Sequence, residues 1–442
     1  MGSDAWLEGI LADVPGEPFD NRLNAWRDSL PEGLREVVNR IATAKGGIWL
    51  VGGSVREALL GREQFDFDLA TTLNPDKLLE IFPRALPTGV QFGTVTVRID
   101  GFDEMFEVTT LRKESDYGDG RRPDVVDFGT SLKIDLSRRD FTINAIAVDL
   151  GRRLIHDPFD GRADLSEMRL RAVGNASHRL SEDGLRLMRG YRFMDQGERG
   201  VWSPDEALST ALREQQSMLD NVANERVWHE FSRILTGNNA AAVIERMRED
   251  GILSRILPGW DADTSPQHVL DAPEDDLAIC RLVLLAAEIH HDRWRVLEDD
   301  LRVLKTSNND RSRFMSLHRL LGKLPDPNNV SELRRYRFGT GNAIQAHLAI
   351  EDTLRPEVSA SVRDALQSLR PLTAGELPII DGYAIASATG LPMGRRLGQL
   401  KSWLHRMQIE LDLANPEQVL ALLDVIDWVG GNPESWQGPS WP

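Results

Sequence analysis

Residues 64–72, QFDFDLATT, place two aspartates one residue apart inside an otherwise apolar run. If this run is a strand, Asp66 and Asp68 share one face, because successive side chains alternate between the two sides. Their charges then repel each other, so either one pKa rises or a cation lies between them, and hard oxygen ligands suit Mg²⁺. A solvent-exposed pair at a sheet edge is the commoner explanation for an isolated DxD. The neighbouring motifs decide between the two.

The composition is that of an ordinary soluble globular protein, with 442 residues, 41% of them hydrophobic and 27% charged. The single cysteine, Cys280, excludes an intramolecular disulfide framework and a cysteine-rich zinc site, and it fits a reducing compartment. The first residues, MGSDAWLEGI, lack the basic and apolar regions of a signal peptide, and no run of about 18 apolar residues occurs. We therefore expect a cytoplasmic protein with no membrane partner. The net charge of −17 argues against indiscriminate binding of polyanions but permits a local basic patch.

Strand and helix signals alternate in the first part of the chain. Strands are predicted at 47–51, 65–70, 93–99, 106–110 and 143–149, and helices at 55–60 and 75–82. Residues 113–123, KESDYGDGRRP, are expected to form a mobile loop, and residues 1–24 a loose arm. After about residue 165 helical periodicity continues to the end. The predicted fold class is α+β, a mixed sheet with helices followed by a long all-helical body.

The motif VGGSVRE, residues 51–57, supplies the context that the two aspartates need. A strand is expected to end on Gly52 and Gly53, and the backbone N–H groups of the next helix, with Arg56 nearby, would form a phosphate pocket. Phosphate donors beside a metal site are the arrangement that nucleotidyl transfer requires. Glu107, on a later strand, is a candidate third carboxylate that orients or deprotonates an attacking hydroxyl. An ordinary edge-strand glutamate explains it equally well.

Two further segments carry charged residues ahead of apolar runs. In SRRDFTINAIAVD, residues 137–149, arginines suit a triphosphate because they stay charged and bind it bidentately, and an aspartate beside them suits a ribose hydroxyl. In RLSEDGLRLMRGYRF, residues 179–193, Ser181 is expected to cap a helix whose first turn holds two acids. Asp183 and Arg186 lie three positions apart, so they would share a face and could bind the edge of a base. Helix capping alone is the simpler explanation.

The ordered motifs GGSVRE, DFDLAT, RRDFTINAIA, DPFDG, EDGLRLMR and NERVWHEF resemble the class II tRNA nucleotidyltransferase and bacterial poly(A) polymerase family. The similarity is dense over about residues 45–260 and reaches residues 377–400. It implies a polymerase-β-like nucleotidyltransferase head followed by an all-helical neck, body and tail. The implied division is an arm at 1–24, the catalytic head at 25–165, the neck at 166–235, the body at 236–350 and a tRNA-binding tail at 351–442.

The resemblance also implies a role for single residues. Asp66 and Asp68 would hold two Mg²⁺ ions, with Glu107 as the third catalytic candidate. The following set would contact the nucleotide: Gly52, Gly53, Arg56, Arg139, Asp140, Asn144, Glu182, Asp183, Arg186, Arg189 and Arg226. Within it, the Glu–Asp–Arg group of the neck matches the protein template that selects CTP and ATP by imitating Watson–Crick hydrogen bonds. Arg226 and Glu230 match the motif that supports this template, whereas Glu57 stands where the family usually has aspartate and is left out of the catalytic set.

The implied activity is template-independent addition of C, C and A to the 3′ end of tRNA from CTP and ATP, by two-metal transfer with release of pyrophosphate. Addition of the terminal A alone stays open. The loop 113–126 is present in full, and enzymes restricted to CC have it shortened. Poly(A) polymerases of this class tend to have a basic C-terminal extension, whereas this chain ends acidic and rich in Trp and Pro. A non-catalytic RNA-binding relic would have a damaged metal site, and a signalling nucleotidyltransferase would need neither the template nor the helical body.

The expected partner is the acceptor arm and elbow of tRNA, which calls for a basic surface on a negatively charged protein. Residues 301–340 contain nine Lys or Arg against three acids. Arg395, Arg396 and Lys401 form a second cluster. Solvated helix faces are the usual explanation of such clusters, so the RNA partner depends mainly on the resemblance.

Overall fold

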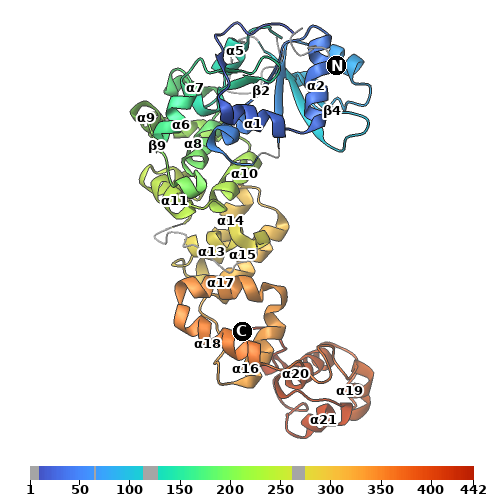
Figure 1. Ribbon diagram of the computed structural model, residues 1–442. Helices are drawn as coiled ribbons and strands as arrows, with labels where there is room; N and C mark the ends of the chain where they lie inside the picture. Colours follow the sequence, from blue (N-terminus) through green and yellow to red (C-terminus); the bar gives the residue numbers. More distant parts are fainter. Residues whose placement is uncertain (1–8, 64–65, 113–127, 261–273) are drawn as a thin grey trace. The chain divides into compact units, whose positions relative to one another are not determined.

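The computed structural model describes residues 9–63, 66–112, 128–260 and 274–442 (Figure 1). These form two compact units, Met1–Ile252 and Leu253–Pro442. The first contains a seven-stranded mixed sheet with helices, and the second is helical, so the α+β class is confirmed. No helix in the described ranges is long and apolar enough to cross a membrane. The predicted loop at 113–123 lies outside the described residues.

The sheet has the order β1-β7-β6-β2-β3-β5-β4, in which only β3 and β5 are parallel. Strand β2 is central and all four of its residues are buried, which explains the uninterrupted apolar run IWLV. On one face of the sheet, Trp49 and Val51 of β2 pack with Leu132 and Leu136, which belong to the helix Leu132–Ser137. The strands are β1 (Glu17–Pro18), β2 (Ile48–Val51), β3 (Asp68–Thr71), β4 (Thr94–Arg98), β5 (Met105–Thr110), β6 (Ala147–Asp149) and β7 (Leu154–His156).

The described part of the first unit contains eleven α-helices: α1 (Asn21–Ser29), α2 (Glu32–Thr43), α3 (Gly53–Leu60), α4 (Pro75–Ile81), α5 (Leu132–Ser137), α6 (Gly161–Glu167), α7 (Ala176–Glu182), α8 (Leu185–Met194), α9 (Glu206–Glu214), α10 (Asn224–Leu235) and α11 (Ala240–Glu249). Short 3₁₀ helices join them: η2 (Val90–Phe92), η3 (Thr142–Asn144), η4 (Gly197–Arg199) and η5 (Gln216–Asn221). A two-stranded parallel sheet, β8 (Arg169–Leu170) with β9 (Ser203–Pro204), lies in the neck, where no strand was expected.

Two other expectations for the first unit are wrong. The strand predicted at 143–149 is only Ala147–Asp149, because residues 142–144 form η3, and the Thr142 N–H donates to the Arg171 carbonyl at 3.0 Å. The arm is not loose from residue 9 onward. Arg152 donates to the Gly9 carbonyl at 2.6 Å, and β1 pairs with β7. Both features depend on contacts across the fold, which a local pattern cannot indicate.

The second unit is built from α-helices and short 3₁₀ turns. The α-helices are α12 (Ile252–Ile256), α13 (Leu277–Leu285), α14 (Trp294–Val303), α15 (Asn308–Leu320), α16 (Val330–Thr340), α17 (Ile344–Leu354), α18 (Pro356–Ser368), α19 (Gly382–Thr389), α20 (Arg395–Leu411) and α21 (Pro416–Leu420). The 3₁₀ turns are η6 (Glu274–Asp276), η7 (His291–Arg293), η8 (Gly341–Ala343), η9 (Ala421–Asp424) and η10 (Pro433–Ser435). One core gathers around Tyr336 and Leu348, and another around Leu400 and Leu404 of α20.

A buried acid in the second unit allows a stability prediction. Glu351 is fully buried and accepts hydrogen bonds from the Gly322 N–H and from Arg355 Nη1, both at 2.7 Å. Burial alone would raise the pKa of Glu351, but His347, the Gly322 N–H and Arg355 together hold it below its usual value. We expect Glu351→Gln to lower the free energy of unfolding by about 2–4 kcal/mol at about pH 7.

The pH dependence follows from the direction of that shift. A carboxyl whose folded pKa is lowered contributes stability above its unfolded pKa and loses it as the pH falls through the folded value. The difference between wild type and Glu351→Gln should therefore shrink as the pH falls below the ordinary glutamate value of 4.5. Urea unfolding at a series of pH values measures it, and a difference that stays constant into acid would contradict the ionised state assigned to Glu351.

Candidate active site

The two aspartates of the opening motif lie at and just before the start of β3. Asp68 is the first residue of the strand and Asp66 precedes it, so the expectation that both belong to one strand is wrong. The register gives the reason: Asp68 pairs with Val51, the last residue of β2, after which the chain turns at Gly52 into α3. Residues ahead of Asp68 have no β2 partner. Both carboxylates are exposed to solvent.

Negative charge is concentrated at this end of β3. Although Asp68 is accessible, the protein atoms around it and the charge of Asp66 raise its pKa, with Glu107 adding to the rise and Arg139 opposing it. Glu107 is the register partner of Asp68 in the parallel pair β3–β5, so the two side chains lie on the same side of the sheet. The structure thus brings the three predicted catalytic carboxylates together.

This donor set fits Mg²⁺ in one particular way. Within the described ranges, no group of three or more His, Cys, Asp or Glu side chains is arranged to hold a metal ion alone. Mg²⁺ is commonly bound by one or two carboxylates, with phosphate oxygens and waters completing its shell. Asp66 and Asp68 can supply the carboxylates, and a phosphate held by the neighbouring groups can supply the other oxygen ligands.

The groups suited to bind phosphate lie at the turn between β2 and α3. Gly52 has φ +75°, and a Cβ at this position would lie 3.0 Å from Arg139 Nη1 and 3.6 Å from Asp68 Oδ2. Only glycine allows the guanidinium and the carboxylate to approach the turn from both sides. Helix α3 begins at Gly53 with no side-chain cap, so its first N–H groups point to this spot. Arg139 Nε is buried and bonds to none of the described groups.

Four of the predicted nucleotide-binding residues form one continuous polar chain. Arg56 donates to Asn144 Oδ1, and Asn144 Nδ2 donates to Asp140 Oδ1 at 2.9 Å. Asp140 Oδ2 accepts from Arg189 Nε at 2.7 Å. Burial of Asp140 would raise its pKa, but the charge of Arg189 and the hydrogen bonds from Asn144, Arg189 and the Phe141 N–H hold it below its ordinary value. The chain links α3 of the head to α8 of the neck.

The predicted helix start at Ser181 is wrong. Ser181 and Glu182 lie in the last turn of α7, and α8 begins at Leu185, whose N–H donates to Asp183 Oδ1 at 3.0 Å. The break falls at Gly184, where a Cβ would lie 2.2 Å from the Met218 carbonyl oxygen. The carbonyl of another segment therefore lies against the chain at the point where α7 ends and α8 begins.

The template candidates are held by their own contacts. Arg186 donates to Glu182 and, at 2.8 Å each, to the carbonyl oxygens of Arg179 and Arg138. Asp183 is half exposed, and its Oδ2 lies 3.4 Å from Arg226 Nη2. Asp183 and Arg186 make no ion pair with each other among the described contacts, and Asp183 is the more accessible of the two side chains. The structure places both at the junction of α7 and α8.

Sequence reasoning gave no role to Arg192 or Phe193, although they follow the template motif directly. Arg192 Nε lies 2.7 Å from Glu230 Oε2, and Phe193 lies among three guanidinium groups. A YRF triplet in a helix carries no spacing signal by itself. Arg189 and Arg192 belong to the same helix as Phe193, whereas Arg56 comes from α3 and Glu230 from α10, and only the folded chain shows these two contacts.

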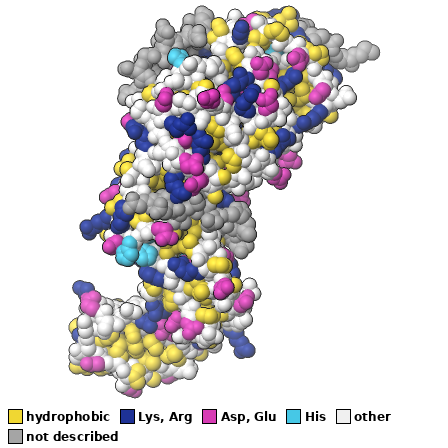
Figure 2. Space-filling model, turned by 90° about the vertical axis from the view of Figure 1, so that its left-hand side faces the viewer, with side chains coloured by type: hydrophobic (Ala, Val, Ile, Leu, Met, Phe, Trp, Pro, Cys, Tyr) yellow, Lys and Arg dark blue, Asp and Glu magenta, His cyan; other side chains and the backbone are white. Residues whose placement is uncertain are grey.

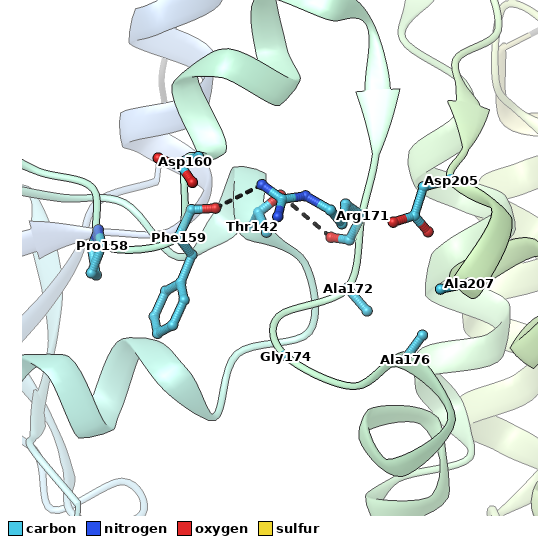
Figure 3. A pocket seen from close by; sticks show the side chains of 10 residues that line it. All are labelled: Thr142, Pro158, Phe159, Asp160, Arg171, Ala172, Gly174, Ala176, Asp205 and Ala207. Carbon is cyan, nitrogen blue, oxygen red and sulfur yellow. Dashed lines mark hydrogen bonds between the residues drawn. The ribbon is translucent and has the colours of Figure 1, made fainter.

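A cavity of about 290 Å³ lies elsewhere in the first unit (Figure 3). Arg171 crosses it, donating to the Phe159 carbonyl and to Asp164 Oδ2, both at 2.9 Å. None of the predicted catalytic or nucleotide-binding residues lines it. We assign this arginine a structural role: it holds the DPFDG segment through the Phe159 carbonyl, and with Arg169 it supplies charge to Asp164 of α6, which is fully buried. The lining residues are Thr142, Pro158, Phe159, Asp160, Arg171, Ala172, Gly174, Ala176, Asp205 and Ala207.

Most arginines of the predicted basic segment have partners within the chain. Arg313 pairs with Asp276, Arg334 with Asp412 and Arg335 with Glu410. In the other cluster, Arg396 donates to the Trp428 carbonyl. On the face shown in Figure 2, acidic and basic side chains are interspersed. A tRNA-binding role for these clusters stays a prediction.

Comparison with known proteins places this geometry in context. Residues 48–171 match the family model described as the poly A polymerase head domain, and residues 203–264 match one described as a probable RNA and SrmB-binding site of polymerase A. The CCA-adding enzyme of Lactococcus lactis subsp. cremoris (strain SK11) is 42% identical over 417 residues, which is 90% of this chain and 97% of that enzyme. That of Geobacillus sp. (strain WCH70) is 33% identical over 387 residues, 84% of this chain and 90% of that enzyme.

A solved structure agrees with these relatives. The crystal structure of the Bacillus stearothermophilus CCA-adding enzyme in complex with CTP is similar at a TM-score of 0.68 and 25% identity. The match covers 89% of this chain and 96% of that one. The likeness therefore extends over most of both compact units.

Proposed function

The chain belongs to the CCA-adding enzyme family, and from this membership we propose that it adds C, C and A to the 3′ end of tRNA, using CTP and ATP and releasing pyrophosphate. The observation that carries the proposal is the site at the start of β3. There Asp66, Asp68 and Glu107 lie beside an uncapped helix start and Arg139. In the same unit, the junction of α7 and α8 presents Asp183 and Arg186.

We propose Mg²⁺ as the cofactor, held by Asp66 and Asp68. Bound there, two Mg²⁺ ions would lower the pKa of the tRNA 3′-hydroxyl and stabilise charge on the α-phosphate and on the leaving pyrophosphate. The first N–H groups of α3 and the guanidinium of Arg139 orient the triphosphate. Glu107, on the same side of the sheet as Asp68, orients the attacking hydroxyl or accepts its proton.

Base selection is assigned to Asp183 and Arg186. Cytosine and adenine both present a donor, the exocyclic amino group, next to a ring-nitrogen acceptor, whereas uracil and guanine present the reverse. An aspartate offers only acceptors and an arginine only donors, so the pair matches C and A. Arginine has five N–H donors, and contacts with Glu182 and two carbonyl oxygens leave some of them for a base. Buried groups left unpaired would disfavour the wrong base by a few kcal/mol.

Addition of the terminal A alone is the second candidate. The loop at 113–126 that bears on this choice lies outside the described residues. The names of the relatives favour addition of all three nucleotides.

The test uses purified protein, Mg²⁺ and three tRNAs that end at the discriminator base, after the first C or after the second C. Each is incubated with labelled CTP or ATP. We expect C to be added to the first two substrates and A to the third. Incorporation of A on the third substrate without C on the first would convert the assignment to an A-adding enzyme. No incorporation on any substrate would overturn the proposed function.

A further inference from the structure

Phe193, near the end of α8, has an unusual set of neighbours. Its ring centroid lies 4.8 Å from the guanidinium carbon of Arg56, 5.2 Å from that of Arg189 and 4.5 Å from that of Arg192. The ring of Phe141 meets it edge to face, at 5.6 Å and 73°. Phe193 is only 7% exposed, so the guanidinium groups lie against a buried ring. A buried phenylalanine ordinarily packs against aliphatic groups, not cations.

The Phe193 ring contacts both ends of the polar chain described above. The chain and the ring together form a closed loop of contacts, which we call the circuit. Arg56 bonds to Asn144, Asn144 to Asp140 and Asp140 to Arg189. Both arginines at the ends of this chain then lie against the same ring. Phe193 is therefore the one apolar member of a loop of contacts that joins α3, η3 and α8. A shift of the ring would move both ends at once.

Electrostatics explains why an aromatic ring is needed at this position. Burial lowers the pKa of Arg192 to about 10; Glu230 opposes this, and the charges of Arg189, Arg233 and Arg56 add to it. Guanidinium groups crowded in this way repel one another. The negative face of an aromatic ring attracts a cation, and the effect strengthens when the cation is desolvated. An aliphatic side chain of similar size would fill the space without that attraction.

We propose that Phe193 is a positioning residue for the incoming nucleotide, which holds Arg56 and Arg189 in the places from which they contact it. The inference rests on the proposed function, because it takes the nucleotide as the ligand of these arginines. Phe193 touches no reacting atom in this scheme. It acts through the two guanidinium groups, and its loss should weaken nucleotide binding more than the chemical step.

The test compares Phe193→Leu with wild type in steady-state addition of C and of A. We expect KM for CTP and for ATP to rise about tenfold, with kcat within about threefold, because an interaction made equally in ground and transition states is lost. Phe193→Tyr keeps the ring and should stay within about threefold of wild type in KM. Phe193→Met fills the site with a flexible apolar chain and should match the leucine variant.

Phe82→Leu is the matched control. Phe82 is also a buried ring, at the end of α4, and Arg40 lies 6.0 Å from its centroid, but it belongs to no part of the circuit. Its replacement should lower thermal stability and leave both KM values unchanged. If every folded aliphatic variant of Phe193 keeps the wild-type KM, or if Phe82→Leu raises KM equally, the inference fails while wild-type activity upholds the proposed function. A wild type that adds neither nucleotide would instead count against the proposed function itself.

Discussion

Asp68→Ala and Asp66→Ala should each lower the rate of C and A addition by at least about 10³-fold, because each removes a ligand from the proposed metal site. Pyrophosphate release and primer extension in Mg²⁺ measure the loss. The fold should survive both changes, since both side chains are exposed and neither lies in the buried core. Full activity in either variant would remove the metal assignment.

A second readout separates metal binding from catalysis. A ligand that binds only the folded state raises the melting temperature, so Mg²⁺ with a nucleotide should stabilise wild type measurably. Asp68→Ala should lose most of this gain. Without metal, the same variant should be at least as stable as wild type, because Asp68 no longer meets the repulsion of Asp66 and Glu107.

Asp103→Ala is the control for both readouts. Asp103 is an exposed acid of the same unit, two residues before β5. Its replacement removes the same charge at a position outside the site. Activity and the Mg²⁺-dependent shift in melting temperature should both stay at the wild-type level. An equal loss in Asp103→Ala and Asp68→Ala would mean that net charge, not a metal site, governs the response.

The parts of the fold that the sequence predicted are those that depend on local pattern. The strands predicted at 47–51, 93–99 and 106–110 form as β2, β4 and β5; β2 is an unbroken apolar run, and β4 and β5 alternate between buried and accessible residues. Helix α4 begins with Pro75 in its first position, as predicted. Proline is favoured at this position because the first N–H groups of a helix have no partner within the helix, so its missing N–H loses no hydrogen bond. Each of these elements carries its own signal, so no knowledge of its partners was needed.

The predictions that are wrong concern features that depend on contacts between distant segments and not on local pattern. Asp66 lies outside β3 because β2 ends at Val51, and Ser181 caps no helix because another segment approaches Gly184. Strands of two or three residues, such as β1 and β7, are too short to show alternation. Each outcome is set by a contact between segments that are distant in the chain.

In the candidate site, too, the sequence indicated the individual residues but not the contacts between distant segments. Motif order and the family resemblance named the residues, and the structure places the acids, the glycine turn and Arg139 together. The links between motifs were not visible in the sequence. Arg56 and Asn144 are 88 positions apart, and Arg189 and Asp140 are 49 apart. The first bond depends on how α3 packs beside η3, and the second on how α8 packs beside the segment before η3, and no spacing rule contains either.

The largest change in specificity is expected from Asp183→Asn. The amide would present N–H donors where the carboxylate accepted, so the amino group of cytosine or adenine would face another donor. We expect kcat/KM for CTP and ATP to fall about 10²-fold, and discrimination against UTP and GTP to fall about 10- to 100-fold. Competition among four labelled nucleotides, on tRNAs ending before and after CC, measures both quantities.

We choose asparagine because it changes the hydrogen-bonding pattern that faces the base while it keeps the contact of residue 183 with the protein backbone. The amide oxygen can still accept from the Leu185 N–H, as Asp183 Oδ1 does at 3.0 Å, so the turn that leads into α8 keeps this hydrogen bond. Asp205→Asn makes the same change at the cap of α9, where Asp205 Oδ1 accepts from the Leu208 N–H at 2.8 Å, and it should leave selectivity unchanged. If Asp183→Asn keeps the wild-type preference for C and A, base selection cannot depend on the acceptor pattern of this side chain. Selection would then have to come from Arg186 and its neighbours alone.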